Sequence, residues 1–288
     1  MKVGIYGVFI NKYIHFLDHF LKNSGRFLGN HEKVYFIVTD KDNEDLIKEY
    51  QEEYNIHYFL TDFIGWPYES LYRYVYFDQF DKAIVNECKY IYSLNGNIIF
   101  LQDCNDEVLP DKTGYVFASH THERCQGGGD TTKSDSMELN KNSSCYLSPR
   151  KNLNYIIGGI FGCETDKFLK LIHKLKSDVF ENEKNNHIAI WHDETHLNYY
   201  VNEILKNNVK YLPPPYVLWR GNQDAWMPPE LGSMPLWKLY YNNKVDFLRK
   251  DSLFLEKPTD HNVVRYGKII KNPYNSHIVK ELSKGTQL

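Results

Sequence analysis

The chain has 288 residues, of which 42% are hydrophobic and 25% charged, so it can bury a sizeable core and wholesale disorder is excluded. Thirty-four Lys and Arg against 37 Asp and Glu give a net charge of −3, which argues against a nucleic-acid binder. The five cysteines form no CxxC pair, and their odd number favours a reducing compartment over a disulfide framework or a zinc ribbon. With no secretory leader and no apolar run of the roughly 18–20 residues that span a bilayer, we expect a cytoplasmic protein.

The first hundred residues alternate strand and helix signals. Short apolar runs predict strands over 3–9, 34–38, 56–60 and 90–94, and helical spacing predicts helices over 13–27, 42–54 and 69–86. Strands interleaved with helices of this length predict an α/β fold with a mostly parallel sheet covered on both faces. Ligands of such sheets bind beyond the carboxyl ends of the strands.

The middle of the chain differs in composition. A strand is predicted over 114–119, but residues 125–144 (CQGGGDTTKSDSMELNKNSS) have almost no apolar content and predict a long mobile loop. Order resumes with further predicted elements, which are a strand over 155–162, a helix from an N-cap at Thr165 to about Glu181, and a helix over 192–205. The last seventy residues predict irregular structure. No linker divides the chain, so we expect one domain over 1–270 and a polar tail over 271–288.

Two motifs predict a cofactor site only weakly. Gly127–Gly129 neither follows a strand nor opens a helix, so a flexible lid is favoured over a phosphate cradle. His192 and His196 have the i, i+4 spacing of a zinc pair, but Asp193 stands where a zincin requires Glu. The acidic residues beside these histidines are explained equally well by helix capping and by a site of chemistry.

Asn95-Gly96-Asn97 lies between two apolar runs. By local rules it is a hairpin turn. The alternative is that this strand end lines a nucleotide pocket with two amides. Amides are poorer ligands than carboxylates for hard cations, so such a pocket predicts no metal.

Several segments together resemble glycosyltransferase family 6, which includes the histo-blood group A and B transferases and the α-1,3-galactosyltransferases. Residues 190–198 (IWHDETHLN) match the family's WHDES-HLN segment nearly residue for residue, and 155–162 (YIIGGIFG) are similar to its YYLGGFFGG. Residues 8–13 and 34–40 resemble its VFAIKKY and HYYVFTD, and 258–265 resemble its P-x-x-H-Q-A-V-R. The resemblance covers about residues 3 to 265, with the motifs in the family's order.

The resemblance implies a single nucleotide-sugar-binding domain of the GT-A type. It also implies a retaining α-1,3-glycosyltransferase that moves GalNAc or Gal from UDP to a galactose-terminated glycan, with or without fucose. The alternatives are a noncatalytic carbohydrate-binding module on the same scaffold and a transferase specific for UDP-galactose. A chain without an anchor or stem resembles bacterial or viral members, which extend surface polysaccharides, and a lipid-linked acceptor would bring it to a membrane surface.

The resemblance also implies roles for individual residues. Glu194 is the implied catalytic residue, and Trp191 and Thr121 are implied to bind the acceptor. The implied donor-binding residues are Phe9, Ile10 and Tyr13 at the uridine, Arg73 and Asp193 at the donor, Ile157 and Gly159 at the sugar 2-substituent, and Arg265 at the diphosphate. Because glycine leaves room for an acetamido group, Gly159 favours GalNAc over galactose.

The sequence departs from the animal members at several positions. Asn95 and Asn97 stand where those enzymes have Asp-x-Asp, and the bacterial members that share Asn-x-Asn work without metal, so we expect no metal and no cofactor. Phe117 falls where an acceptor-binding His is expected. Thr259 falls where a diphosphate-binding Lys is expected, and Lys257 is the candidate to replace it.

Overall fold

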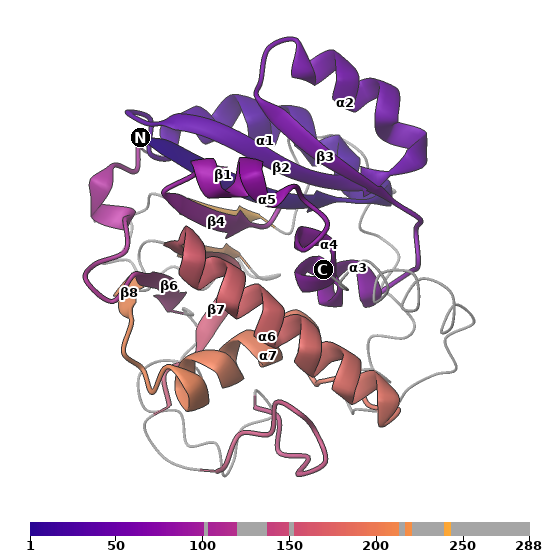
Figure 1. The fold of residues 1–288 in the computed structure, drawn as a ribbon, viewed down its shortest axis with the longest axis vertical. Helices are drawn as coiled ribbons and strands as arrows, with labels where there is room; N and C mark the ends of the chain where they lie inside the picture. Colours follow the sequence, from indigo (N-terminus) through magenta and orange to yellow (C-terminus); the bar gives the residue numbers. More distant parts are fainter. Residues whose placement is uncertain (101–102, 120–136, 150–152, 213–216, 221–238, 243–288) are drawn as a thin grey trace.

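The computed structural model describes residues 1–100, 103–119, 137–149, 153–212, 217–220 and 239–242 (Figure 1). A seven-stranded sheet has the order β3-β2-β1-β4-β7-β6-β8. Its strands are β1 (Lys2–Phe9), β2 (Glu32–Asp40), β3 (Ile56–Thr61), β4 (Tyr90–Leu94), β6 (Tyr115–Ser119), β7 (Ile156–Glu164) and β8 (Lys210–Leu212).

One strand of this sheet runs against the others. β7 is antiparallel to both of its neighbours, β4 and β6, whereas every other pair in the sheet is parallel. The predicted mostly parallel α/β sheet is confirmed. The amino end of β7 therefore lies at the same edge as the carboxyl ends of the other strands, which is the edge where such sheets bind ligands.

Helices cover both faces of the sheet, which explains why β2 is apolar without interruption. Val34, Phe36 and Val38 face one core with α3 (Tyr68–Leu71), α4 (Arg73–Phe77), α5 (Lys82–Glu87), α6 (Thr165–Lys184) and α7 (His192–Tyr199). Tyr35 and Ile37 face a second core with α1 (Leu17–Asn23) and α2 (Glu44–Gln51). In Figure 1, α6 and α7 lie side by side across one face, and α1 and α2 lie near β2 and β3. The remaining short helical turns are η1 (Asn11–Phe16), η2 (Ser24–Arg26), η3 (Lys41–Asn43) and η4 (Asp106–Val108), and α7 continues as the π-helix η6 (Tyr200–Ile204).

Three predicted helices differ in the structure. The helix predicted over 13–27 is divided among η1, α1 and η2, and the one predicted over 69–86 is divided among α3, α4 and α5. Asp81 begins α5 afresh, because its carboxylate accepts the Ala83 amide at 2.8 Å. The N-cap predicted at Thr165 is also wrong, since Glu164 takes the cap position and the Thr165 hydroxyl donates to the Cys88 carbonyl at 2.5 Å.

The predicted hairpin at Asn95-Gly96-Asn97 is not formed. β5 (Ile98–Phe100) pairs with β10 (Leu239–Asn242), which pairs in turn with β9 (Val217–Arg220), in a separate three-stranded sheet. The Asn95 amide instead donates to the Gly159 carbonyl at 2.9 Å, so the chain just after β4 remains hydrogen-bonded to β7. β9 and β10 also correct the prediction that the last seventy residues are irregular throughout.

Part of the loop predicted over 125–144 has a defined place. Residues 137–144 lie against α6, whereas 125–136, with the three glycines, fall outside the described residues, as does the polar tail over 271–288. None of the helices in the described part of the chain is long and apolar enough to cross a membrane.

Candidate active site

The candidate site lies where the end of β4 meets the beginning of β7, with α4 and α7 beside them. Arg73 begins α4 and is only 7% exposed. Its guanidinium has three partners on three elements: Nε lies 3.2 Å from Asp193 Oδ2, Nη1 donates to the Gly158 carbonyl at 3.0 Å, and Nη2 donates to Asn95 Oδ1 at 2.7 Å. The planar fork of an arginine suits this role, because its donors point in fixed, divergent directions.

Asp193, in the first turn of α7, is held on both sides. Its side chain is as buried as that of Arg73, so the two form a desolvated ion pair. The Ser70 hydroxyl donates to the other carboxylate oxygen, and the Tyr74 hydroxyl donates to the Asp193 carbonyl at 2.8 Å. The Asp193 carboxylate, held by Arg73 and Ser70, is fixed in orientation.

Glu194, the next residue, directs its carboxylate at the start of β7. Oε1 accepts the Tyr155 hydroxyl at 2.5 Å, and Oε2 accepts the Gly158 amide at 2.6 Å. Burial raises the pKa of Glu194 to about 7, against the hydrogen bonds from Gly158 and Tyr155, which lower it. Glu194 is therefore a positioned carboxyl group whose charge changes near neutral pH.

Gly158 lets this carboxylate lie against the strand. A methyl group on Gly158 would lie 3.1 Å from Glu194 Cβ and 3.3 Å from Oε2. Both distances are tighter than ordinary van der Waals contact, so a side chain at Gly158 would require Glu194 to shift by a few tenths of an ångström. Sequence reasoning missed Tyr155 and Gly158, although both stand in the YIIGGIFG segment.

Asparagine side chains attach α7 to β7. Asn198 Oδ1 accepts the Ile156 amide at 2.9 Å, and Asn198 Nδ2 donates to the Ile156 carbonyl at 3.0 Å. The Asn198 side chain thus makes the two hydrogen bonds that a paired strand would make with Ile156. One turn later, Asn202 Nδ2 donates to the Asn154 carbonyl at 3.0 Å. These bonds fix the distance between α7, which carries Glu194, and the start of β7.

The residues predicted to hold uridine lie nearby with different exposure. Phe9 and Ile10, at the end of β1, are buried, and a methyl group on Gly96 would lie 2.6 Å from the Phe9 ring. Tyr13 is 36% exposed and is the most exposed of the three. Desolvation raises the pKa of Tyr13, while Arg73 lowers it and Asp193 raises it, so its hydroxyl lies in the field of that ion pair.

The other predicted residues are placed unevenly. Ile157 and Asn97 are buried, and the Gly159 carbonyl accepts the Asn95 amide. Trp191, partly buried, precedes α7, and its amide donates to Thr195 Oγ1 at 2.8 Å. Phe117 is a core residue of β6, whose ring stacks on Phe161 with centroids 6.0 Å apart. Thr121, Lys257, Thr259 and Arg265 lie outside the described residues.

The described side chains supply no ready metal centre. Across the parts of the chain with a defined position, no group of three or more His, Cys, Asp and Glu side chains could hold an ion. At the end of β4, Asn95 Oδ1 accepts a hydrogen bond from Arg73. His196 is fully buried and its pKa is lowered to about 3 by desolvation and by neighbouring cations, so it is a neutral core histidine.

Comparison with known proteins matches most of the chain to one family. The family model described as Glycosyltransferase family 6 matches residues 1–238. The O-antigen biosynthesis glycosyltransferase WbnI of Escherichia coli is 27% identical over 203 residues, which cover 69% of this chain and 82% of that protein. Histo-blood group ABO system transferases 1 and 2 of Rattus norvegicus are 23% and 22% identical over 227 residues, or 78% of this chain. The matched region spans 62% and 65% of the two rat enzymes, less than two thirds of their length.

Proposed function

Since the chain belongs to glycosyltransferase family 6, we propose that it is a retaining α-1,3-glycosyltransferase with a UDP-sugar donor. The acceptor is the 3-hydroxyl of a galactose-terminated glycan, and the sugar moved is GalNAc, with galactose a poorer substrate. One similar protein is named for O-antigen biosynthesis, which supports a surface oligosaccharide or polysaccharide as the product.

The observation that carries this proposal is the carboxylate of Glu194 between two donors. Tyr155 and Gly158 hold its oxygens at 2.5 and 2.6 Å, directly beside the Arg73–Asp193 ion pair. A fixed carboxylate in a partly dry site stabilises positive charge far better than one in water, because no solvent has to reorganise. Glycosyl transfer develops such charge at the anomeric carbon.

The reaction exchanges one bond at that carbon for another. The bond from C1 to the β-phosphate oxygen breaks, and UDP leaves with the electron pair. The acceptor 3-oxygen bonds to C1, and its proton passes to the departing phosphate. Glu194 acts on the opposite face of the sugar, either as a nucleophile in two displacements or as an electrostatic partner of the oxocarbenium ion.

Asp193 and Arg73 are suited to the donor sugar. The Asp193 carboxylate can accept hydrogen bonds from sugar hydroxyls, while Arg73 supplies the compensating charge 3.2 Å away. Arg73 also links this carboxylate to Asn95 at the end of β4. Asp193 and Asn95 are therefore linked through Arg73 in one network of polar contacts.

We propose that the leaving group is neutralised without a divalent metal. Asn95 and Asn97 carry no charge that would hold an ion against the diphosphate. Instead, the positive charges of Arg265 and Lys257, together with hydrogen bonds from backbone amides, stabilise the negative charge of the diphosphate.

Donor choice is the experiment that tests the proposal most directly. Equal concentrations of UDP-GalNAc and UDP-Gal are offered with lactose and 2′-fucosyllactose, and product mass, free UDP and anomeric configuration are measured. We expect an α-linked product richer in GalNAc, and Gly159→Ala should move the ratio toward galactose by roughly tenfold, since one methyl group fills part of the acetamido space. Transfer of galactose alone would contradict the donor assignment. Absence of both transfer and donor hydrolysis would favour the binding module.

A further inference from the structure

The segment before β7 carries a buried carboxylate that the proposed chemistry does not use. Glu138 is 5% exposed, although it stands among Asn, Ser and Lys residues. Met137 and Leu147 form a small apolar cluster with Leu153 and Tyr155, and the Leu147 amide donates to the Glu138 carbonyl at 2.8 Å. This packing turns the carboxylate inward, where an unpaired charge would be costly.

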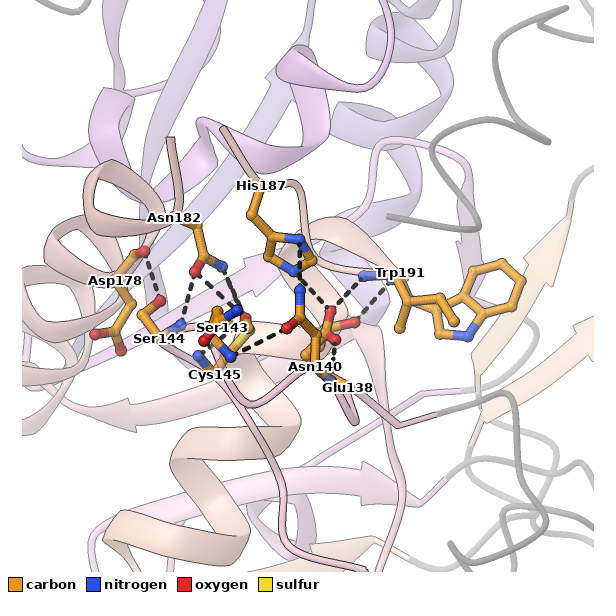
Figure 2. Close-up of polar contacts among 12 residues, drawn as sticks. Glu138, Asn140, Ser143, Ser144, Cys145, Asp178, Asn182, His187 and Trp191 are labelled. Carbon is orange, nitrogen blue, oxygen red and sulfur yellow. Dashed lines mark hydrogen bonds and ion pairs between the residues drawn. The ribbon is translucent and has the colours of Figure 1, made fainter. Parts of the chain in front are cut away.

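Three donors surround the Glu138 carboxylate (Figure 2). Oε1 accepts the Asn140 amide at 2.9 Å, and Oε2 accepts the Ile190 amide at 3.2 Å and lies 3.0 Å from His187 Nε2. Asn140 Nδ2 lies 3.3 Å from the other ring nitrogen of His187. The ring of His187 therefore lies between the Glu138 carboxylate and the Asn140 side chain.

The Ile190 amide belongs to the turn that begins α7. The next amide, that of Trp191, donates to Thr195 Oγ1 at 2.8 Å, so two successive amides end on side chains from different segments. His192 follows with φ 52, in the left-handed region that residues other than glycine enter only when neighbours hold them there. Glu138 and Thr195 are thus the side chains that accept the Ile190 and Trp191 amides of the turn that presents Trp191.

The segment has its own anchorage on α6. Asn182 Oδ1 accepts the Ser144 amide at 2.7 Å, and the Ser144 hydroxyl donates to the Asp178 carbonyl at 2.7 Å (Figure 2). The segment that carries Glu138 is therefore held against α6. The Glu138 carboxylate contacts Asn140, His187 and Ile190, which lie outside the network of Arg73, Asp193 and Asn95.

We propose that Glu138 is a positioning residue for the acceptor side of the reaction, because it fixes the turn from which Trp191 projects. Figure 2 shows the indole of Trp191 pointing away from the polar network, with its backbone beside it. The inference rests on the proposed function only where it assigns Trp191 to the acceptor. Loss of the Glu138 charge weakens acceptor binding and leaves donor binding in place.

Glu138→Gln tests this, because it keeps the size of the side chain and removes the charge. The matched control is Glu181→Gln on the exposed surface of α6, where the carboxylate contacts Lys184 at 3.4 Å. Amide hydrogen exchange is measured over peptides spanning 186–193 and 71–78. We expect about tenfold faster exchange over 186–193 in Glu138→Gln alone, since a charged acceptor is replaced by a weaker one, and no change over 71–78.

Kinetics supply the second readout. With UDP-GalNAc as donor, the KM for lactose or 2′-fucosyllactose rises about tenfold in Glu138→Gln, while the Kd for UDP changes less than twofold. Glu138→Asp, which keeps the charge but withdraws it from Ile190, takes its place if the Gln variant does not fold.

Two results would overturn the inference. One is unchanged exchange over 186–193 in a folded variant, and the other is an equal loss of UDP and acceptor binding, which marks a general structural role. A wild-type protein that transfers to no acceptor contradicts the proposed function instead. The exchange measurement then still decides the role of Glu138, since it needs no activity.

Discussion

Glu194 shows how one side chain is shaped by its neighbours. Burial raises its pKa to about 7, and the donors Tyr155 and Gly158 hold it while it is ionised. A carboxyl group with a raised pKa stabilises the fold fully below its ordinary pKa of about 4.5, and this contribution is lost as the pH rises through about 7. Ionisation of Glu194 therefore lowers the free energy of unfolding at neutral pH, where the proposed reaction requires the ionised form.

Glu194→Gln separates these two effects. We expect transfer to fall at least about a hundredfold with UDP binding nearly unchanged, because only the transition state needs the charge. The same variant should gain about 1–3 kcal/mol in unfolding free energy relative to wild type between pH 4.5 and pH 8. Urea unfolding at both pH values and steady-state kinetics measure the two quantities. Retention of more than about a tenth of kcat/KM, or a pH-independent stability difference, would contradict this account.

The wild-type pH profile follows from the same group. Because the ionised carboxylate is the active form, kcat/KM should rise with pH around an apparent pKa of about 7. Initial rates between pH 5 and pH 9 at low donor concentration measure this. A rate that falls over that range would contradict an ionised Glu194.

At the scale of elements, the predicted strands are reliable where buried apolar runs end in turns, as in β2 and β4. The long helix over 69–86 was predicted from periodicity, but Asp81 caps a new helix and the buried Asp78 binds Lys176 at 2.7 Å, a contact between distant segments. The contact of Glu194 with Tyr155 likewise joins residues 39 positions apart. Local patterns do not contain such pairings, so the sequence identified the catalytic candidate and not the groups that hold it.

The attachment of α7 to β7 gives a prediction at this scale. Asn198→Ala removes the two hydrogen bonds that the Asn198 side chain makes with the Ile156 amide and carbonyl, so we expect a loss of about 1–3 kcal/mol in unfolding free energy. Asn55→Ala, at an exposed position before β3, is the control and should change stability by less than about 0.5 kcal/mol. Thermal and urea unfolding measure both. Equal effects of the two substitutions would show that the Asn198 bonds do not fasten α7.

At the scale of the whole molecule, the donor edge is assembled around an arginine. Arg73 joins α4, α7, β7 and the end of β4, the place where a metal would meet the diphosphate. We expect the purified protein to keep its activity and its Tm in excess EDTA, because Asn95 and Asn97 at the end of β4 offer amides, which are poorer ligands than carboxylates for hard cations. Rates with and without EDTA, and after addition of Mn²⁺, measure this. A strict need for Mn²⁺ would contradict the prediction.

The reversed strand has a consequence for how such a protein diversifies. Because β7 is antiparallel to β6, Ser119 at the end of β6 pairs with Ile156 at the start of β7. The connection between them therefore leaves and returns at the edge where Gly158 contacts Glu194, while β1 and β4 belong to other parts of the chain. A change of length in this connection would alter the surroundings of Glu194 and leave the pairing of β1 with β4 as it is.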